Sequence, residues 1–170
     1  FLAMLYTQFM KYKNAKVFIF DKGASSKVPT YANGGIFYDL GIDDISFQPL
    51  RALGKLNDKT LTEDEEELEK IRRNIELEWA FDWLIDIFEA ENKILTPSHK
   101  EKIWSSLELV ANSEIEYRTL TTFATFLADP ELKEALSPYL ITGPLGKYFD
   151  SNEENLQDST WNVFEMNQIL

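Results

Sequence analysis

The stretch Lys16-Val17-Phe18-Ile19-Phe20-Asp21-Lys22-Gly23 decides the fold class of this chain. Its apolar run is continuous rather than alternating, and its β-branched and aromatic residues favour a strand. A strand that is apolar on both faces is typical of a parallel sheet covered on both sides. Asp21, Lys22 and Gly23 then end the strand in a turn. The stretch therefore predicts one strand of a parallel α/β sheet.

The flanking segments support an α/β arrangement. Residues 1–10 are apolar nearly all round, which predicts a buried helix, and Lys11, Lys13 and Asn14 end it. Residues 34–41 predict a second strand between turns, and residues 161–166 a third. Because this sheet is small, we expect apolar surface to stay exposed on residues 1–20.

A long helix is predicted from Thr62 to about Glu91. Thr62 to Glu65 form a capping box, with acids in the first turn where the helix dipole favours them. An apolar stripe at three- and four-residue spacing predicts the buried face: Leu68, Ile71, Ile75, Trp79, Trp83 and Ile87. A second row widens its C-terminal half, which implies deeper burial there: Leu77, Ala80, Leu84 and Phe88. We expect Trp79 and Trp83 to lie in the core.

Three shorter helices follow, and the order of elements suggests how the chain is organised. Thr96 and Asp129 are N-cap residues, each followed by a proline at the first helical position, and each predicts the start of a helix. Thr119 begins the helix between them. The fold class is therefore α/β with an all-α insertion. Residues 1–59 form the N-terminal part of the α/β core, 60–140 the α-helical insertion, and 141–170 a linker and return strand.

Composition excludes several kinds of function. The 170 residues contain 17 basic and 29 acidic side chains, a net charge of −12, so direct duplex nucleic-acid binding is not expected. The absence of cysteine excludes disulfides, zinc–thiolate sites, iron–sulfur clusters and cysteine nucleophiles. No apolar run approaches the roughly 20 residues of a membrane span.

Few residues are candidates for chemistry. Asp21 and Lys22 lie where a parallel strand ends, the edge at which open α/β sheets bind ligands, although their position alone favours a plain turn with Lys22 in solvent. Residues 143–148 look like a phosphate loop, but position 141 is Ile and position 148 is Tyr, so we interpret them as a turn. His99 is interpreted as a surface residue and the acids of 63–69 as a solvated helix turn. The residues alone define no catalytic set and no metal ligand set.

Several strings together resemble a known family. They are residues 1–9, 16–25, 35–41 with 47–50, 118–120, 143–146 with Asp150, and 163–166. In this order they resemble the TrbE/CagE-type ATPases of conjugative transfer and type IV secretion systems. The resemblance covers nearly the whole chain.

The resemblance implies a partial RecA-like P-loop NTPase core with a helical subdomain. In that family the phosphate-binding loop precedes the helix that residues 1–10 resemble, and the acidic magnesium motif follows the strand that 163–166 resemble. Both lie outside these 170 residues. The resemblance therefore implies ATP and Mg²⁺ in the intact protein and no cofactor for this chain alone, which we expect to be inactive. Asp21 and Lys22 become candidates for the nucleotide edge.

The resemblance also implies a cellular role. The intact protein would be a bacterial cytoplasmic ATPase peripheral to the inner membrane, forming homo-oligomers with other secretion-system subunits as partners and powering substrate export or pilus assembly. One alternative is a non-enzymatic helical protein–protein interaction module built on residues 60–140. A second is an acidic DNA mimic. A phosphate-loop sequence encoded just before Phe1 would favour the ATPase hypothesis. A native start codon at that point would favour the interaction module.

Overall fold

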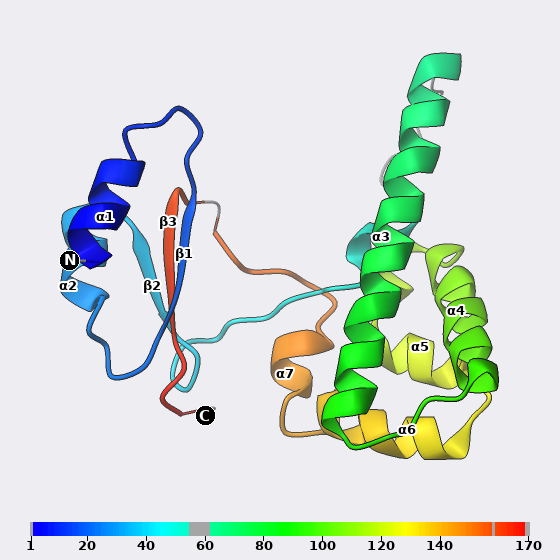
Figure 1. Cartoon of the computed structure of the whole chain (residues 1–170). Helices are drawn as coiled ribbons and strands as arrows, with labels where there is room; N and C mark the ends of the chain where they lie inside the picture. The colour runs from blue at the N-terminus through cyan, green and yellow to red at the C-terminus, as the bar shows by residue number, and fades with distance from the viewer. Residues whose placement is uncertain (1, 55–61, 158, 169–170) are drawn as a thin grey trace. The chain divides into compact units, whose positions relative to one another are not determined.

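A computed structural model describes residues 2–54, 62–157 and 159–168. The chain divides into two compact units (Figure 1). An α/β unit combines both ends of the chain, Phe1–Ile45 and Asn155–Leu170, and a helical unit comprises Ser46–Glu154.

The α/β unit is built on three parallel strands. They are β1 (Val17–Asp21), β2 (Ile36–Asp39) and β3 (Trp161–Glu165), in the order β1-β3-β2. β3 is central, and its register aligns Val17 with Trp161 and Ile36 with Asn162. This confirms the predicted strands and their parallel pairing.

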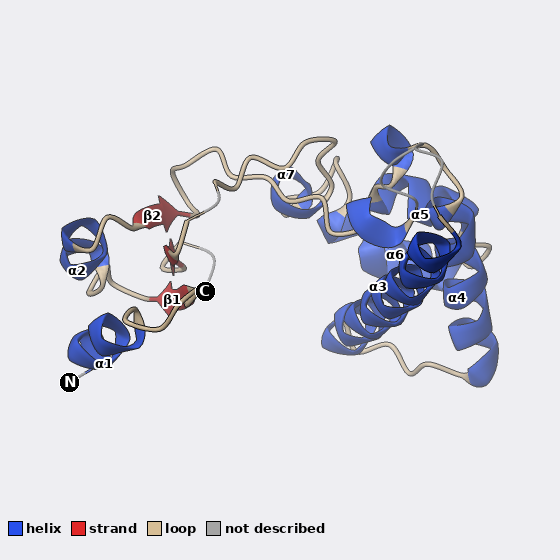
Figure 2. Cartoon of the chain, turned by 90° about the horizontal axis from the view of Figure 1, so that it is seen from above, coloured by secondary structure: helices blue, strands red, loops and turns tan. Residues whose placement is uncertain are grey.

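Two helices, α1 (Leu2–Phe9) and α2 (Lys27–Ala32), lie on the same side of this sheet (Figures 1 and 2). Tyr6 of α1 contacts Trp161 edge-to-face with ring centroids 6.1 Å apart, and Tyr31 of α2 packs near Phe37. Helix α2 was not predicted from the sequence, because six residues that include Pro29 carry no clear helical period.

The prediction that β1 is covered on both faces is wrong for the described unit. Phe18 and Phe20 point away from the helices and are 53% and 72% exposed. The prediction that residues 1–10 form a buried helix is also wrong: Met4, Leu5 and Phe9 are exposed, and Tyr6 and Met10 pack against the core. The expected apolar surface on residues 1–20 is thereby confirmed.

The helical unit confirms the predicted helices. Its α-helices are α3 (Glu63–Ala90), α4 (Pro97–Ala111), α5 (Leu120–Phe126), α6 (Pro130–Leu136) and α7 (Gly146–Phe149). Short 3-10 turns join them: η1 (Arg51–Leu53), η2 (Ile115–Tyr117) and η3 (Ser137–Tyr139). Thr62, Thr96, Thr119 and Asp129 cap their helices as the sequence predicts.

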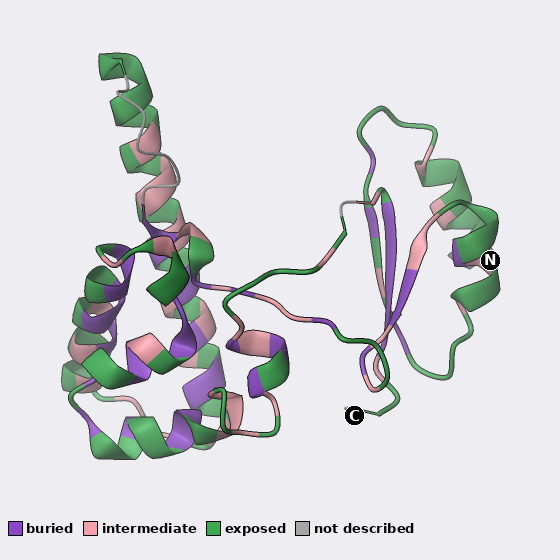
Figure 3. Ribbon diagram, turned by 180° about the vertical axis from the view of Figure 1, so that it is seen from behind, coloured by how far each residue is buried: buried purple, intermediate pink, exposed green. Residues whose placement is uncertain are grey.

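The core of this unit forms on the second apolar row of α3. Leu84 and Phe88 are fully buried with Leu107 of α4 and Phe123 of α5, and Figure 3 shows buried segments facing one another across these helices. Leu50 belongs to the same core. The predicted domain boundaries at residues 60 and 140 consequently fall inside the helical unit.

The first apolar row of α3 is buried only at its C-terminal end, where Ile87 lies in the core and Trp83 packs against it. The prediction of a buried face is wrong for the rest of the row. Leu68, Ile71, Ile75 and Trp79 are exposed, because the other helices pack on the opposite side and the N-terminal turns of α3 extend beyond α4 (Figures 1 and 3). Trp79 stacks on Trp83, with centroids 5.8 Å apart and planes 7° from parallel. Trp83 packs against the core, whereas Trp79 does not.

Candidate functional site

The turn after β1 is organised by the carboxylate of Asp21. Its Oδ1 accepts hydrogen bonds from the Lys22 amide at 2.9 Å and the Ser25 hydroxyl at 2.7 Å, and its Oδ2 from the Ser26 amide at 2.7 Å. Burial would raise the pKa of Asp21, but these hydrogen bonds outweigh it, so the pKa lies below its ordinary value. Asp21 is therefore an ionised anchor of the turn at neutral pH.

The neighbouring strand contributes a second carboxylate to the same turn. Glu165 ends β3, and its carboxylate accepts from the amides of Gly23 at 3.0 Å, Ala24, and Asn167 at 2.9 Å. Burial and the charge of Asp21 act to raise the pKa of Glu165, but the hydrogen bonds from the backbone outweigh both effects. The pKa of Glu165 therefore lies below its ordinary value. Gly23 and Ala24 have φ of 92° and 55°, and the Glu165 carboxylate holds them in this uncommon conformation.

The acids of all three strands lie in one row across the sheet. Asp21 and Asp39 both align with Glu165 in the strand register. The Asp39 carboxylate accepts from the Gly41 amide at 3.2 Å and so shapes the turn after β2. In the part of the chain that the structure describes, no group of three or more His, Cys, Asp or Glu side chains is placed to hold a metal ion. The role that the structure shows for these three acids is to order the turns that follow β1 and β2.

A cavity of about 560 Å³ lies beside the Asp21 turn. Asp21, Ser25 and Ser26 form its polar side, and Tyr6 and Trp161 are among its apolar walls. Trp161 is 1% exposed, and its indole N–H has no hydrogen-bond partner among the residues that the structure describes. The cavity offers a mixed apolar and polar surface next to an ionised carboxylate.

The two candidates of the sequence analysis differ in position. Asp21 is buried and lines the cavity, whereas the Lys22 side chain is exposed and does not. Glu165 was missed as a site residue, since one acid at a strand end carries no local motif. Its contact to residues 142 positions earlier depends on the parallel pairing of β1 with β3.

The glycine-containing segment at 143–148 is a turn only over residues 143–145, because residues 146–148 belong to the short helix α7, which was not predicted from the sequence. A Cβ on Gly146 would lie 1.9 Å from the Leu140 carbonyl oxygen, so this glycine permits a close backbone approach. The Asp150 carboxylate holds the segment in place by accepting hydrogen bonds from the amides of Thr121 and Ile141, at 2.9 and 2.7 Å. These contacts are structural.

His99 also has a structural role. Its Nδ1 accepts from the Thr96 amide at 3.3 Å in the cap of α4, and its Nε2 lies 3.8 Å from Asp129. The acids in the first turn of α3 are exposed, as expected, and Glu65 closes the capping box with Thr62. Neither feature is a catalytic arrangement.

The parallel sheet with helices on one face defines an α/β protein that also contains a separate helical unit. No protein-family model matches the chain. It is 26% identical over 169 residues to a probable conjugal transfer protein TrbE of Sinorhizobium fredii (strain NBRC 101917 / NGR234), covering 99% of this chain and 23% of that protein. It is 27% identical over 169 residues to the conjugal transfer protein TrbE of Rhizobium radiobacter, covering 99% and 19%. The predicted resemblance to TrbE is confirmed.

The fold is also that of a solved protein. VirB4 of Thermoanaerobacter pseudethanolicus matches with a TM-score of 0.61 and 13% identity, over 98% of this chain and 46% of that one. The chain spans about a fifth of the length of the TrbE relatives. Among the described residues, no helix has the length and apolarity to cross a membrane.

Proposed function

We propose that this chain is a segment of a type IV secretion or conjugal transfer ATPase, contributing part of a RecA-like nucleotide core and a helical insertion. The observation that carries the proposal is the similarity to TrbE over 99% of the chain. The three-stranded parallel sheet supports it, since open α/β sheets bind ligands at the carboxyl edge. In the intact protein, ATP hydrolysis would power substrate export or pilus assembly at the cytoplasmic side of the inner membrane.

Asp21 and Glu165 order the turn, and among the described residues they belong to no group of three or more side chains placed to hold a metal ion. All four carboxylate oxygens of Asp21 and Glu165 already accept hydrogen bonds from the turn at 22–26 or from Asn167. In the intact protein, Mg·ATP supplies the phosphoryl group and its charge neutralisation. The role that remains for Asp21 and Glu165 is to hold the 22–26 turn at the nucleotide edge, with Lys22 directed to solvent beside it.

Substitutions in the longer protein that contains this segment test the proposal. Asp21→Asn and Glu165→Gln each keep the shape of the side chain and remove the charge that orders the turn. We expect each to lower magnesium-dependent ATP hydrolysis at least tenfold, while Glu134→Gln, on an exposed part of α6, leaves it unchanged. Full activity in both sheet-edge variants would contradict the role given to this turn.

The helical unit supports a second, compatible role in binding other subunits of the system. It has its own core, formed by residues such as Leu84 and Leu107, and it also exposes apolar side chains on α3. A folded unit that presents apolar residues to solvent is typical of an interaction module. The assembly of the intact protein into homo-oligomers belongs to the same proposal.

A further inference from the structure

The solvent-facing side of α3 carries four apolar residues in a row. Leu68, Ile71, Ile75 and Trp79 are 66%, 51%, 59% and 49% exposed, and we name them the apolar stripe. Their spacing of three and four residues places them on one face of the helix. The buried residues Leu77, Ala80, Leu84 and Phe88 occupy the opposite face. The stripe is therefore not part of the core of the helical unit.

A groove lies along the C-terminal half of the stripe. Ile75 and Trp79 form one side of a cavity of about 620 Å³, and Pro49, Arg51 and Ala52 line it from the segment before α3. Glu76 and Glu154 also line the cavity, so its charged lining has two acidic side chains and one basic side chain. That segment is fixed in place, because Arg72 donates to the carbonyl oxygens of Ala52 and Gly54, each at 2.7 Å. The groove is thus walled on both sides by ordered residues of the helical unit.

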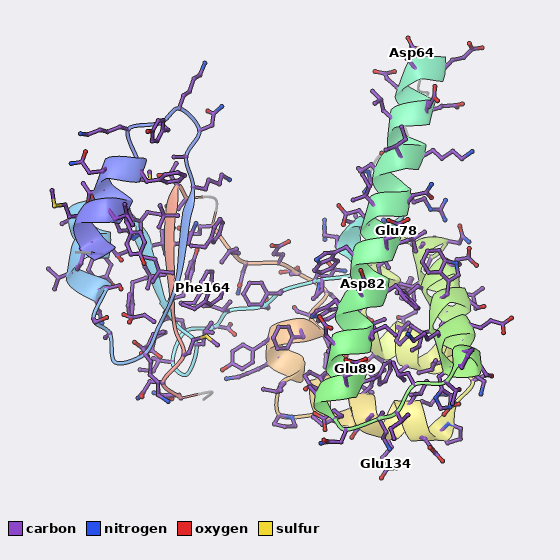
Figure 4. All side chains as sticks on the ribbon, in the orientation of Figure 1. Asp64, Glu78, Asp82, Glu89, Glu134 and Phe164 are labelled. Atoms are coloured by element: carbon purple, nitrogen blue, oxygen red, sulfur yellow. The ribbon has the colours of Figure 1, made fainter. Side chains whose placement is uncertain are left out.

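Acidic residues continue the stripe at both ends. Asp64 lies one turn before Leu68, and Asp82, Asp86 and Glu89 follow Trp79 at the same three- and four-residue spacing. All four acids are exposed. Figure 4 shows three of them, with Glu78, along α3. The helix as a whole has more acidic than basic side chains, and its first turn is entirely acidic. A partner that covers this face must match apolar residues in the middle and negative charge at both ends.

We propose that the apolar stripe and its groove bind a basic amphipathic helix of a partner protein. Such a helix would place its apolar face on Ile75 and Trp79 and its lysines or arginines near Asp64 and Asp82. A second copy of this chain does not fit. Two α3 helices would bring Asp64 against Asp64 or against the acids at 82–89, whichever way they ran, and like charges repel.

This inference deepens the subunit-binding role proposed above and is independent of the nucleotide chemistry. A protein that hydrolyses no ATP can still bind the helix, and one that hydrolyses ATP can lack the site. A failure of the peptide-binding proposal can therefore be distinguished from a failure of the proposed ATPase function.

The probe is a synthetic amphipathic peptide of leucine and lysine, about four helical turns long, with a leucine and glutamate peptide of the same pattern as its counterpart. Binding of the labelled peptides to the 170-residue chain is measured by fluorescence anisotropy. We expect the lysine peptide to bind and the glutamate peptide not to bind, and we expect salt to weaken binding by screening.

Two pairs of variants locate the binding site. Ile75→Ser removes a central apolar contact and is expected to raise Kd about tenfold, whereas Leu109→Ser, at a residue 50% exposed on α4, is expected to leave it unchanged. The double change Asp82→Lys with Glu89→Lys is expected to weaken binding. Glu101→Lys with Glu134→Lys makes the same change in net charge away from α3 and is its control.

Three results would overturn the proposal. The first is equal loss of binding in Ile75→Ser and Leu109→Ser, and the second is equal loss in the two charge-reversal pairs, since either would mean that the peptide binds without using α3. The third is a concentration-dependent dimer, seen by sedimentation, that Ile75→Ser abolishes, because it would make a second copy the occupant. Circular dichroism of each variant checks that the helices remain folded.

Discussion

Replacing Leu84 or Ile75 by alanine separates the two faces of α3. Leu84 is fully buried in the core with Phe88 and Leu107, so Leu84→Ala removes apolar contacts and leaves a cavity. Such substitutions cost about 2–5 kcal/mol. Ile75 lies mostly in water, and exposed substitutions stay within about 0.5 kcal/mol.

For a unit about the size of Ser46–Glu154, 1 kcal/mol corresponds to about 4 °C in Tm. A Leu84→Ala cost of about 3 kcal/mol therefore predicts a fall of about 12 °C, against about 2 °C or less for Ile75→Ala. Thermal unfolding followed by circular dichroism at the helix band measures both. If Ile75→Ala lowers Tm as much as Leu84→Ala, the stripe is buried and the packing described for α3 is wrong.

Three further predictions concern other contacts. Asp129 accepts from Lys102 Nζ at 2.8 Å and caps α6, and chiefly the Lys102 hydrogen bond holds the pKa of Asp129 below its ordinary 3.8, against the opposing effect of burial. Its ionised form thus stabilises the fold above that pH, and the stabilisation is lost as pH falls through the lower folded-state pKa. Asp129→Asn keeps a capping oxygen, so its stability should be lower than that of the wild type at pH 7, by about 1 kcal/mol, and the difference should close as the pH falls through the lowered folded-state pKa of Asp129; a constant difference at all pH values would speak against the ion pair. Gly146→Ala should cost about 1–3 kcal/mol in urea unfolding, because its Cβ would collide with the Leu140 carbonyl oxygen; an unchanged midpoint would contradict that close approach. A dye specific for apolar surface should bind the chain, and Phe20→Ser should reduce the signal, since Phe20 is exposed on β1; undiminished binding in the variant would place the apolar surface elsewhere.

The elements of the sheet were predictable because their signals are local. The apolar run at 17–20 and its Asp-Lys-Gly ending identify β1 without reference to any other segment. Exposed apolar surface on residues 1–20 was predicted, but that it includes Phe18 and Phe20 on one face of β1 was not, since coverage of a strand depends on elements distant in sequence. Short α2 has too few residues for a period to emerge.

Helix α3 shows where periodicity stops being informative. Two apolar rows run along it, and spacing alone does not say which one packs. The row with Leu84 and Phe88 is buried because α4 and α5 lie on that side, and neither helix is encoded in the pattern of α3. At the candidate site, Asp21 was predictable from its place at a strand end. Glu165 was not, because its partners Gly23 and Ala24 are brought to it only by strand pairing.

The most direct measurement compares magnesium-dependent ATP hydrolysis by the 170-residue chain and by the longer protein that contains it, at equal concentrations. The proposed function predicts turnover by the longer protein and none above background by the chain. Turnover by the chain alone that survives purification and is lost in Asp21→Ala would contradict the account. So would a folded longer protein that hydrolyses no ATP.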